Sequence, residues 1–162
     1  MAELLGSPND LRRSYLAAVV LYHTTDHYLV QTQGRDAALA NGRKSPILEL
    51  VKKLSASCPE FLLVRDIADA TKHCELRPQK EVPRGLVSAA SIRRPSGTFS
   101  APFGTAVFGE ASIVTVTTDN GERFPLIGIL ITAYNMWAQL LMRPQIGESQ
   151  STTDLLSDSP RE

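Results

Sequence analysis

The sequence predicts a mainly α-helical domain, a four-helix, bundle-like fold with a β-hairpin (a small antiparallel sheet) inserted before the last helix. Apolar residues recur at helical spacing in four stretches, and a stretch rich in Pro and Gly precedes the fourth. A run of β-branched residues then ends at an Asn-Gly turn. The 162 residues suit one domain, expected over 1–145, with the hairpin at about 106–126 and a flexible polar tail over 146–162.

The first helix is expected to start at the Ser7-Pro8 signal and to run to about Gln33, with apolar residues at helical spacing from Leu11 onward. Ser7 offers a side-chain cap and Pro8 fits the first helical position, where its missing N–H is not needed. Gly34 is expected to end the helix because glycine readily adopts the left-handed conformation that follows many helices.

Two further helices are expected in the middle of the chain. The pair Ser45-Pro46 repeats the cap-plus-proline signal and predicts a helix over 46–55. A third helix is expected from Pro59 to about Glu75, before Pro78 stops it. Its apolar stripe would be Phe61, Val64, Ala68 and Thr71.

The hairpin and the last helix follow a stretch, 77–105, that is expected to form loop or irregular strand. Residues 110–118 are strand-like, and Asp119-Asn120-Gly121 predicts a tight turn because Asn and Gly tolerate positive φ. Helical periodicity resumes at Ile127 and is expected to end near Arg143.

Charge and composition limit the classes of partner and cofactor that we expect for this protein. Lys and Arg number 17 and Asp and Glu number 17, so the chain has no overall pull on nucleic acid or anionic membranes, although a local patch stays open. No apolar run approaches the roughly 18 residues of a membrane span. Two cysteines and no secretory signal indicate a cytoplasmic protein, and the absence of a Gly-rich phosphate loop or dinucleotide fingerprint indicates no cofactor.

Ionisable residues gather on two of the predicted helices. On the first, His23 and His27 are four residues apart, with Asp26 on their flank. They continue an apolar stripe that includes Leu16 and Val20, so we expect them to face inward. On the third helix, five residues share an arc of roughly 120°: Arg65, Asp66, Asp69, Lys72 and His73. If the two faces meet, they form one semi-buried polar cluster.

The order of elements and the Arg65-Asp66…His73 motif resemble the higher eukaryotes and prokaryotes nucleotide-binding (HEPN) domains. These are helical bundles, commonly dimeric, and many are metal-independent RNases of toxin or defence systems. The resemblance implies that Arg65 and His73 form the catalytic pair, oriented by Asp66 and Asp69. It also implies an RNA substrate and a homodimer, and we expect Lys72, His23, Asp26 and His27 of the polar cluster to help bind that RNA. The gap between Arg65 and His73 is one residue longer than is usual in that family.

Two alternatives remain open. His23 and His27 are a competent ligand pair from one helix face, which Asp69 and His73 would complete as a metal site. The cluster would otherwise be structural, in a non-enzymatic module that binds a partner protein. An RNase predicts a groove open to solvent at Arg65 and His73, whereas a structural role predicts that the same residues are closed off with their hydrogen bonds satisfied.

Overall fold

The computed structural model describes residues 1–38, 45–94 and 113–142. It confirms the mainly helical fold with a small antiparallel sheet before the last helix. The helices are α1 (Ala2–Leu5), α2 (Leu11–Gln33), α3 (Arg35–Ala38), α4 (Pro46–Ser57), α5 (Glu60–Ala70) and α6 (Leu126–Met142), with a 3₁₀ turn, η1 (Ala89–Ser91), before the sheet. The strands are β1 (Ile92–Arg93), β2 (Thr115–Thr117) and β3 (Arg123–Pro125). The predicted tail and the first part of the predicted hairpin, 106–112, lie outside the described residues.

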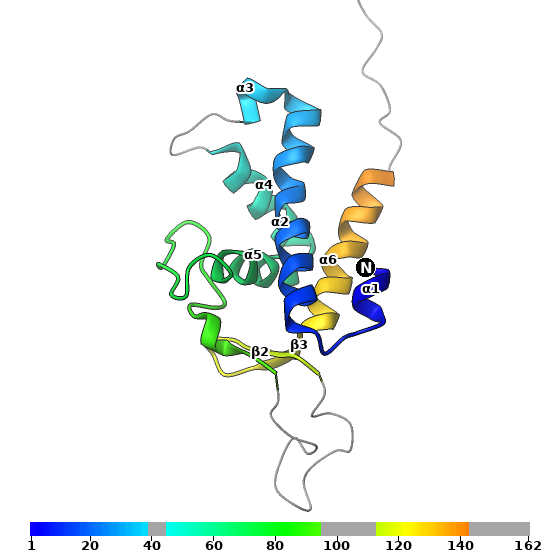
Figure 1. Ribbon diagram of the computed structural model, residues 1–162. Coiled ribbons are helices and arrows are strands. Elements are labelled where there is room, and N and C mark those ends of the chain that lie inside the picture. Colours follow the sequence, from blue (N-terminus) through cyan, green and yellow to red (C-terminus); the bar gives the residue numbers. More distant parts are fainter. Residues whose placement is uncertain (39–44, 95–112, 143–162) are drawn as a thin grey trace, which may run out of the picture.

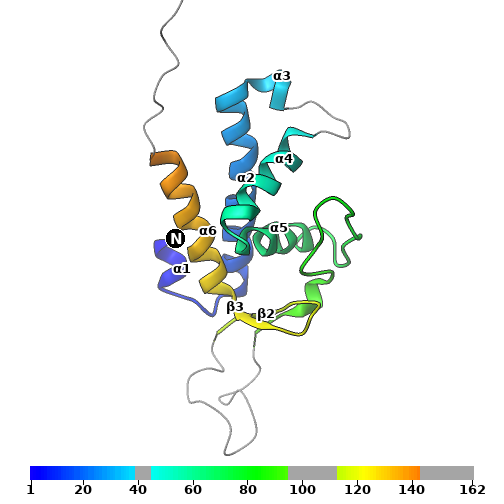
Figure 2. The same cartoon turned by 180° about the vertical axis from the view of Figure 1, so that it is seen from behind.

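Helix α2 is the centre of the fold, and α1, α4, α5 and α6 all contact it. Helices α2 and α6 run side by side in the same direction, whereas α5 crosses them (Figure 1). The sheet lies at the end of the molecule where α2 and α6 begin, which is also visible from behind (Figure 2). The four longer helices therefore surround one interior, but they do not form a parallel bundle.

The two ends of α2 differ in how well the sequence predicted them. The start at Ser7-Pro8 was wrong, because the Ser7 amide closes the preceding short helix by donating to the Leu4 carbonyl at 3.0 Å. Asp10 is the cap instead, and its side chain accepts the Arg13 amide at 3.1 Å. The expected end is confirmed, with Gly34 at a φ of 82°.

The sheet has the order β1-β2-β3, and all its strands are antiparallel. The predicted hairpin is β2 and β3, with Val116 opposite Phe124, and its turn places Gly121 at a φ of 87°. The two-residue strand β1 adds the third strand from within the stretch that was expected to be loop or irregular strand.

The core joins α2, α5 and α6 through aromatic side chains. Phe61 is fully buried and meets Trp137 edge-on, with ring centroids 6.0 Å apart. The Trp137 indole N–H donates to the Leu21 carbonyl at 3.0 Å, so its one polar atom is satisfied. This contact fixes α6 against α2.

The predicted inner face of α2 was wrong. Leu16, Val20 and Val30 are 63%, 58% and 42% exposed. The buried residues of the helix lie on the opposite side and are mostly small: Ser14, Ala18, Leu21, Thr25 and Leu29. Small side chains let α5 and α6 approach the α2 backbone closely, which favours burying that stripe over the bulkier one. His23 and His27 consequently belong to the outer half of the helix.

Candidate functional site

The end of α5 sets the geometry of the whole region. The helix stops at Ala70 and not near Glu75, and in the turn that closes it the amides of Lys72 and His73 both donate to the Asp69 carbonyl at 3.0 Å. Lys72 and His73 therefore sit on an exposed turn after the helix. The prediction that Lys72 and His73 lie on the same helix as Arg65, Asp66 and Asp69 is therefore wrong.

The chain after this turn folds back on α5 as a loop over residues 74–89. Backbone hydrogen bonds close its base, from the Leu76 amide to the Val87 carbonyl at 2.7 Å and from the Ala89 amide to the Cys74 carbonyl at 3.0 Å. Leu76, Val82 and Leu86 are buried beneath it. The 74–89 loop is thus a packed part of the fold.

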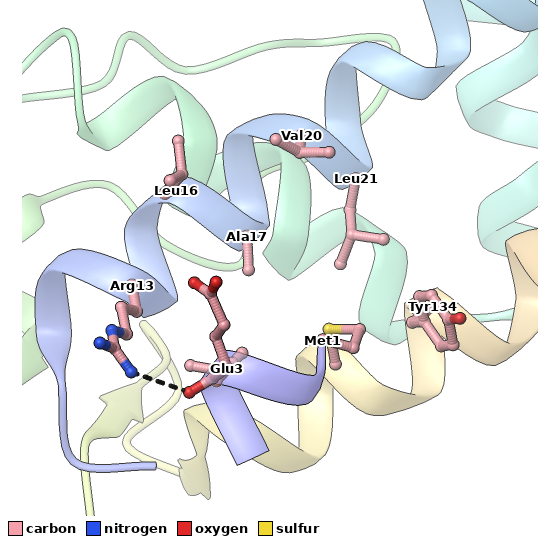
Figure 3. Close-up of a pocket in the computed structure, with 9 residues that line it drawn as sticks. Met1, Glu3, Arg13, Leu16, Ala17, Val20, Leu21 and Tyr134 are labelled. Carbon is pink, nitrogen blue, oxygen red and sulfur yellow. Dashed lines mark hydrogen bonds between the residues drawn. The ribbon is translucent and has the colours of Figure 1, made fainter. Parts of the chain in front are cut away.

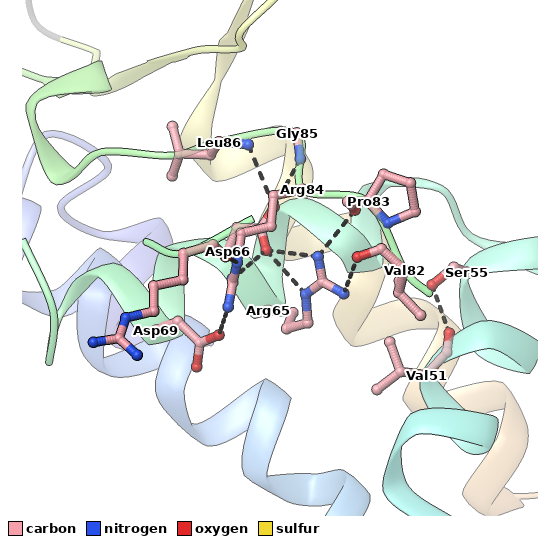
Figure 4. A network of polar contacts seen from close by, with 11 residues as sticks. Val51, Ser55, Arg65, Asp66, Asp69, Val82, Pro83, Arg84, Gly85 and Leu86 are labelled. Carbon is pink, nitrogen blue, oxygen red and sulfur yellow. Dashed lines mark hydrogen bonds and ion pairs between the residues drawn. The ribbon is translucent and has the colours of Figure 1, made fainter. Parts of the chain in front are cut away.

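The carboxylate of Asp66 anchors this loop (Figure 4). Asp66 is fully buried, and its Oδ1 accepts Arg65 Nε at 2.9 Å and Arg84 Nη1 at 2.8 Å. Its Oδ2 accepts the backbone amides of Gly85 and Leu86 at 2.9 and 3.3 Å. Burial raises the pKa of the Asp66 carboxyl, and the positive charge and hydrogen bonds of Arg65, the Gly85 amide and Arg84 oppose that rise.

The two arginines complete the network around that carboxylate. Arg65 is 2% exposed and donates to the carbonyls of Val82 and Pro83 at 3.3 and 3.1 Å. Arg84 also donates to Asp69 Oδ2 at 2.9 Å. Among the described residues, every buried side-chain nitrogen and oxygen has a hydrogen-bond partner. The network is closed and satisfied, as a structural role requires.

The expected cluster consequently separates into two groups. Arg65, Asp66 and Asp69 join Arg84 in the buried network, which has no solvent-open groove at Arg65. The second group is exposed and lies where α2 passes the end of α5.

In the exposed group, the His23 ring contacts the carboxylate of Asp26 through one nitrogen and the ammonium group of Lys72 through the other. His23 Nδ1 lies 2.8 Å from Asp26 Oδ2, and His23 Nε2 lies 3.2 Å from Lys72 Nζ. The His23 and Asp26 side chains are 41% and 44% exposed. A carboxylate accepts and an ammonium donates, so the two contacts fit the imidazole tautomer that carries its proton on Nδ1 and a lone pair on Nε2. Nε2 is then a basic nitrogen beside a cation at the surface.

Tyr22 lies between the two groups. Burial raises the pKa of its hydroxyl, and the charges of Asp69 and Asp26 raise it further, whereas Arg65 and Arg84 lower it. The carboxylates of Asp69, in the buried network, and of Asp26, in the exposed group, therefore both act on the hydroxyl of Tyr22.

The remaining candidate residues stay apart from these groups. His27 is exposed one turn beyond His23 and forms no side-chain hydrogen bond with the described residues. Within the described ranges, no three His, Cys, Asp or Glu side chains are grouped so that they hold a metal ion, and this includes the alternative set His23, His27, Asp69 and His73. Burial raises the pKa of the Cys58 thiol, which disfavours a reactive thiolate there.

The chain matches no protein-family model, no curated protein and no solved structure. None of the described helices combines the length and the apolar character needed to cross a membrane.

Proposed function

We propose that the protein cleaves RNA without a metal ion, using the exposed Asp26–His23–Lys72 group as its reactive centre. The observation that carries the proposal is the pair of contacts on one imidazole, to Asp26 at 2.8 Å and to Lys72 at 3.2 Å. Among side chains, an imidazole is the usual acid or base near neutral pH, and RNA supplies its own nucleophile, the 2′-hydroxyl.

Each member of the group has a defined part in this reaction. Asp26 holds the Nδ1 proton, so Nε2 of His23 accepts the proton of the 2′-hydroxyl. The 2′-oxygen then bonds to phosphorus and the bond to the 5′-oxygen breaks. Lys72 turns from His23 to the phosphate and stabilises the added negative charge. His73, exposed directly after Lys72, donates the proton that the leaving 5′-oxygen takes up. The products are a 2′,3′-cyclic phosphate and a 5′-hydroxyl.

Local charge supports an RNA substrate. Residues 71–94 contain six Lys or Arg and two Glu, although the whole chain is neutral. Arg77, Lys80, Arg93 and Arg94 are exposed in this segment, as is Lys72. A basic segment beside a phosphate-cleaving group supplies the backbone contacts that hold a polyanion in place.

The proposal keeps the chemistry implied by the HEPN resemblance and changes the residues that perform it. Arg65 and Asp66 are assigned to the fold, because both are buried and hold the 74–89 loop. Their network also positions the reactive turn, since Asp69 binds Arg84 with its side chain and the amides of Lys72 and His73 with its carbonyl.

The test is cleavage of a structured RNA by the purified full chain in the presence of EDTA. His23→Ala should abolish cleavage, whereas the matched variant His27→Ala, one turn away on the same helix, should cleave like the wild type. Circular dichroism melts of both variants verify the fold. Equal cleavage by the two variants, or cleavage that EDTA abolishes, would contradict the proposal.

A further inference from the structure

A hollow of about 270 Å³ lies between α1, α2 and α6 (Figure 3). Leu16 and Val20 of α2 line it, and Tyr134 of α6 lines it from the neighbouring helix. These three side chains are 63%, 58% and 46% exposed, so the hollow presents aliphatic surface and an aromatic ring to solvent. Its volume is just below that of pockets for drug-sized ligands, and it therefore suits a ligand with one ring system.

Two side chains of opposite charge also line the hollow. The Glu3 side chain extends from α1 toward α2 (Figure 3), and its carboxylate forms no hydrogen bond or ion pair with any other described residue. Arg13 is held in place, because its Nη1 donates to the Glu3 carbonyl at 3.0 Å and its Nε lies 3.3 Å from Asp10 Oδ2. A ligand that fits must offer N–H donors to the carboxylate and an acceptor to the guanidinium.

The hollow is adjacent to the proposed reactive group. Val20 and His23 are three residues apart on α2, so their Cβ atoms are about 5–6 Å apart on the helix surface. Leu16 and Val20 both lie within about 60° of His23 around the helix axis. A ligand that occupies the hollow therefore lies beside the imidazole.

We infer that the hollow binds a guanine base, that of the nucleotide whose 2′-hydroxyl His23 activates. The inference rests on the proposed function and assigns its base selectivity. Guanine N1–H and N2–H donate to the two carboxylate oxygens of Glu3, and guanine O6 accepts a hydrogen bond from the Arg13 guanidinium. The base lies against the ring of Tyr134, as bases stack on aromatic side chains in many complexes with single-stranded RNA.

The Glu3 carboxylate distinguishes guanine from the other three bases. A carboxylate accepts hydrogen bonds and donates none. Guanine is the base that presents two adjacent N–H donors on its pairing edge, and adenine, cytosine and uracil each place an acceptor beside their donor. With those bases, one oxygen of Glu3 would face a lone pair. Stacking on Tyr134 gives affinity for any base, so the selectivity depends on Glu3.

Isothermal titration calorimetry of the full chain with guanosine, inosine and adenosine 3′-monophosphates tests the inference. Guanosine monophosphate should bind at least about fivefold more tightly than adenosine monophosphate. Inosine lacks the 2-amino group and should bind between the two. Glu3→Gln should weaken guanosine monophosphate binding at least about fivefold, because an amide offers one acceptor and adds a donor. The matched control Glu49→Gln, on α4, should bind it like the wild type.

A second pair of variants tests the stacking contact. Tyr134→Ala should weaken the binding of all three nucleotides at least about fivefold, because it removes the aromatic ring. Tyr134→Phe keeps the ring and should bind them like the wild type. Circular dichroism melts verify that each variant is folded.

Binding and cleavage are separate results, because nucleotide binding does not need the imidazole. A His23→Ala chain that prefers guanosine monophosphate supports the guanine site even if the wild type cleaves no RNA. If the wild type does cleave, its products should end in guanosine 2′,3′-cyclic phosphate. The inference is overturned if no nucleotide binds at millimolar concentration, or if guanosine and adenosine monophosphates bind equally. A guanosine preference that Glu3→Gln retains, or cleavage after all four bases alike, also overturns it.

Discussion

Asp66 and Arg84 are 18 residues apart in the sequence, yet their side chains form a 2.8 Å ion pair in the interior, where Asp66 is fully buried. This contact ties the 74–89 loop to α5. It also separates the polar residues of the region into those that hold the fold and those that face solvent.

Asp66→Asn should lower the free energy of unfolding by about 3–5 kcal/mol, because it leaves the buried Arg65 without a counter-charge and Arg84 with Asp69 alone. Urea denaturation followed by circular dichroism measures this loss. The matched control is Glu49→Gln, which removes an exposed ion pair with Lys52 and should cost less than about 1 kcal/mol. Equal effects of the two variants would contradict the structural role of Asp66.

Arg84→Met should loosen the 74–89 loop while the helices stay folded. The variant loses the contacts to Asp66 and Asp69, but Asp66 keeps Arg65, so a cost of about 1–3 kcal/mol is expected. Tryptic cleavage after the exposed Lys80 should become faster, because proteolysis follows local opening. Arg93→Met, at an exposed site, is the control. If it accelerates cleavage after Lys80 equally, Arg84 does not hold the loop.

Asp26→Asn should slow RNA cleavage by about ten- to a hundredfold, because the amide no longer fixes the His23 proton on Nδ1. Single-turnover rates with saturating enzyme measure the effect without the contribution of product release. Asp36→Asn makes the same chemical change at an exposed position of α3 and should leave the rate unchanged. An unchanged rate for Asp26→Asn would show that the carboxylate does not orient the base.

Lys72→Met should reduce the cleavage rate by about a hundredfold, since it removes the cation proposed to stabilise the added charge on the phosphate. Loss of a phosphate contact should also make RNA binding less dependent on salt. Fluorescence anisotropy over a salt series, together with the rate, measures both effects. Lys53→Met removes an exposed lysine of α4 and should change neither quantity.

The sequence predicted the elements whose ends depend on local signals. Ser45-Pro46 marks the start of α4, Gly34 marks the end of α2, and Asn120-Gly121 marks the hairpin turn. Each signal acts through the conformation of one or two residues, so it operates independently of the tertiary structure.

The features that the sequence did not predict depend on contacts between residues that lie far apart in the chain. Helix α5 ends at Ala70 because the chain beyond it pairs with residues 87–89, and no proline or glycine marks that point. Arg84 is a single arginine in a Pro- and Gly-rich stretch, and nothing around it indicates a buried partner. On α2, the predicted stripe of larger apolar residues is exposed, and only packing against α5 and α6 shows that the stripe of mostly small residues is buried.

The central claim is that His23 activates a 2′-hydroxyl. The most direct measurement uses an oligodeoxynucleotide with a single ribonucleotide, incubated with the full chain in EDTA and analysed by mass spectrometry. The account predicts cleavage only after the ribonucleotide, with a 2′,3′-cyclic phosphate product that His23→Ala does not form and His27→Ala does. Cleavage of the all-deoxy strand, or the same product from His23→Ala, would contradict it.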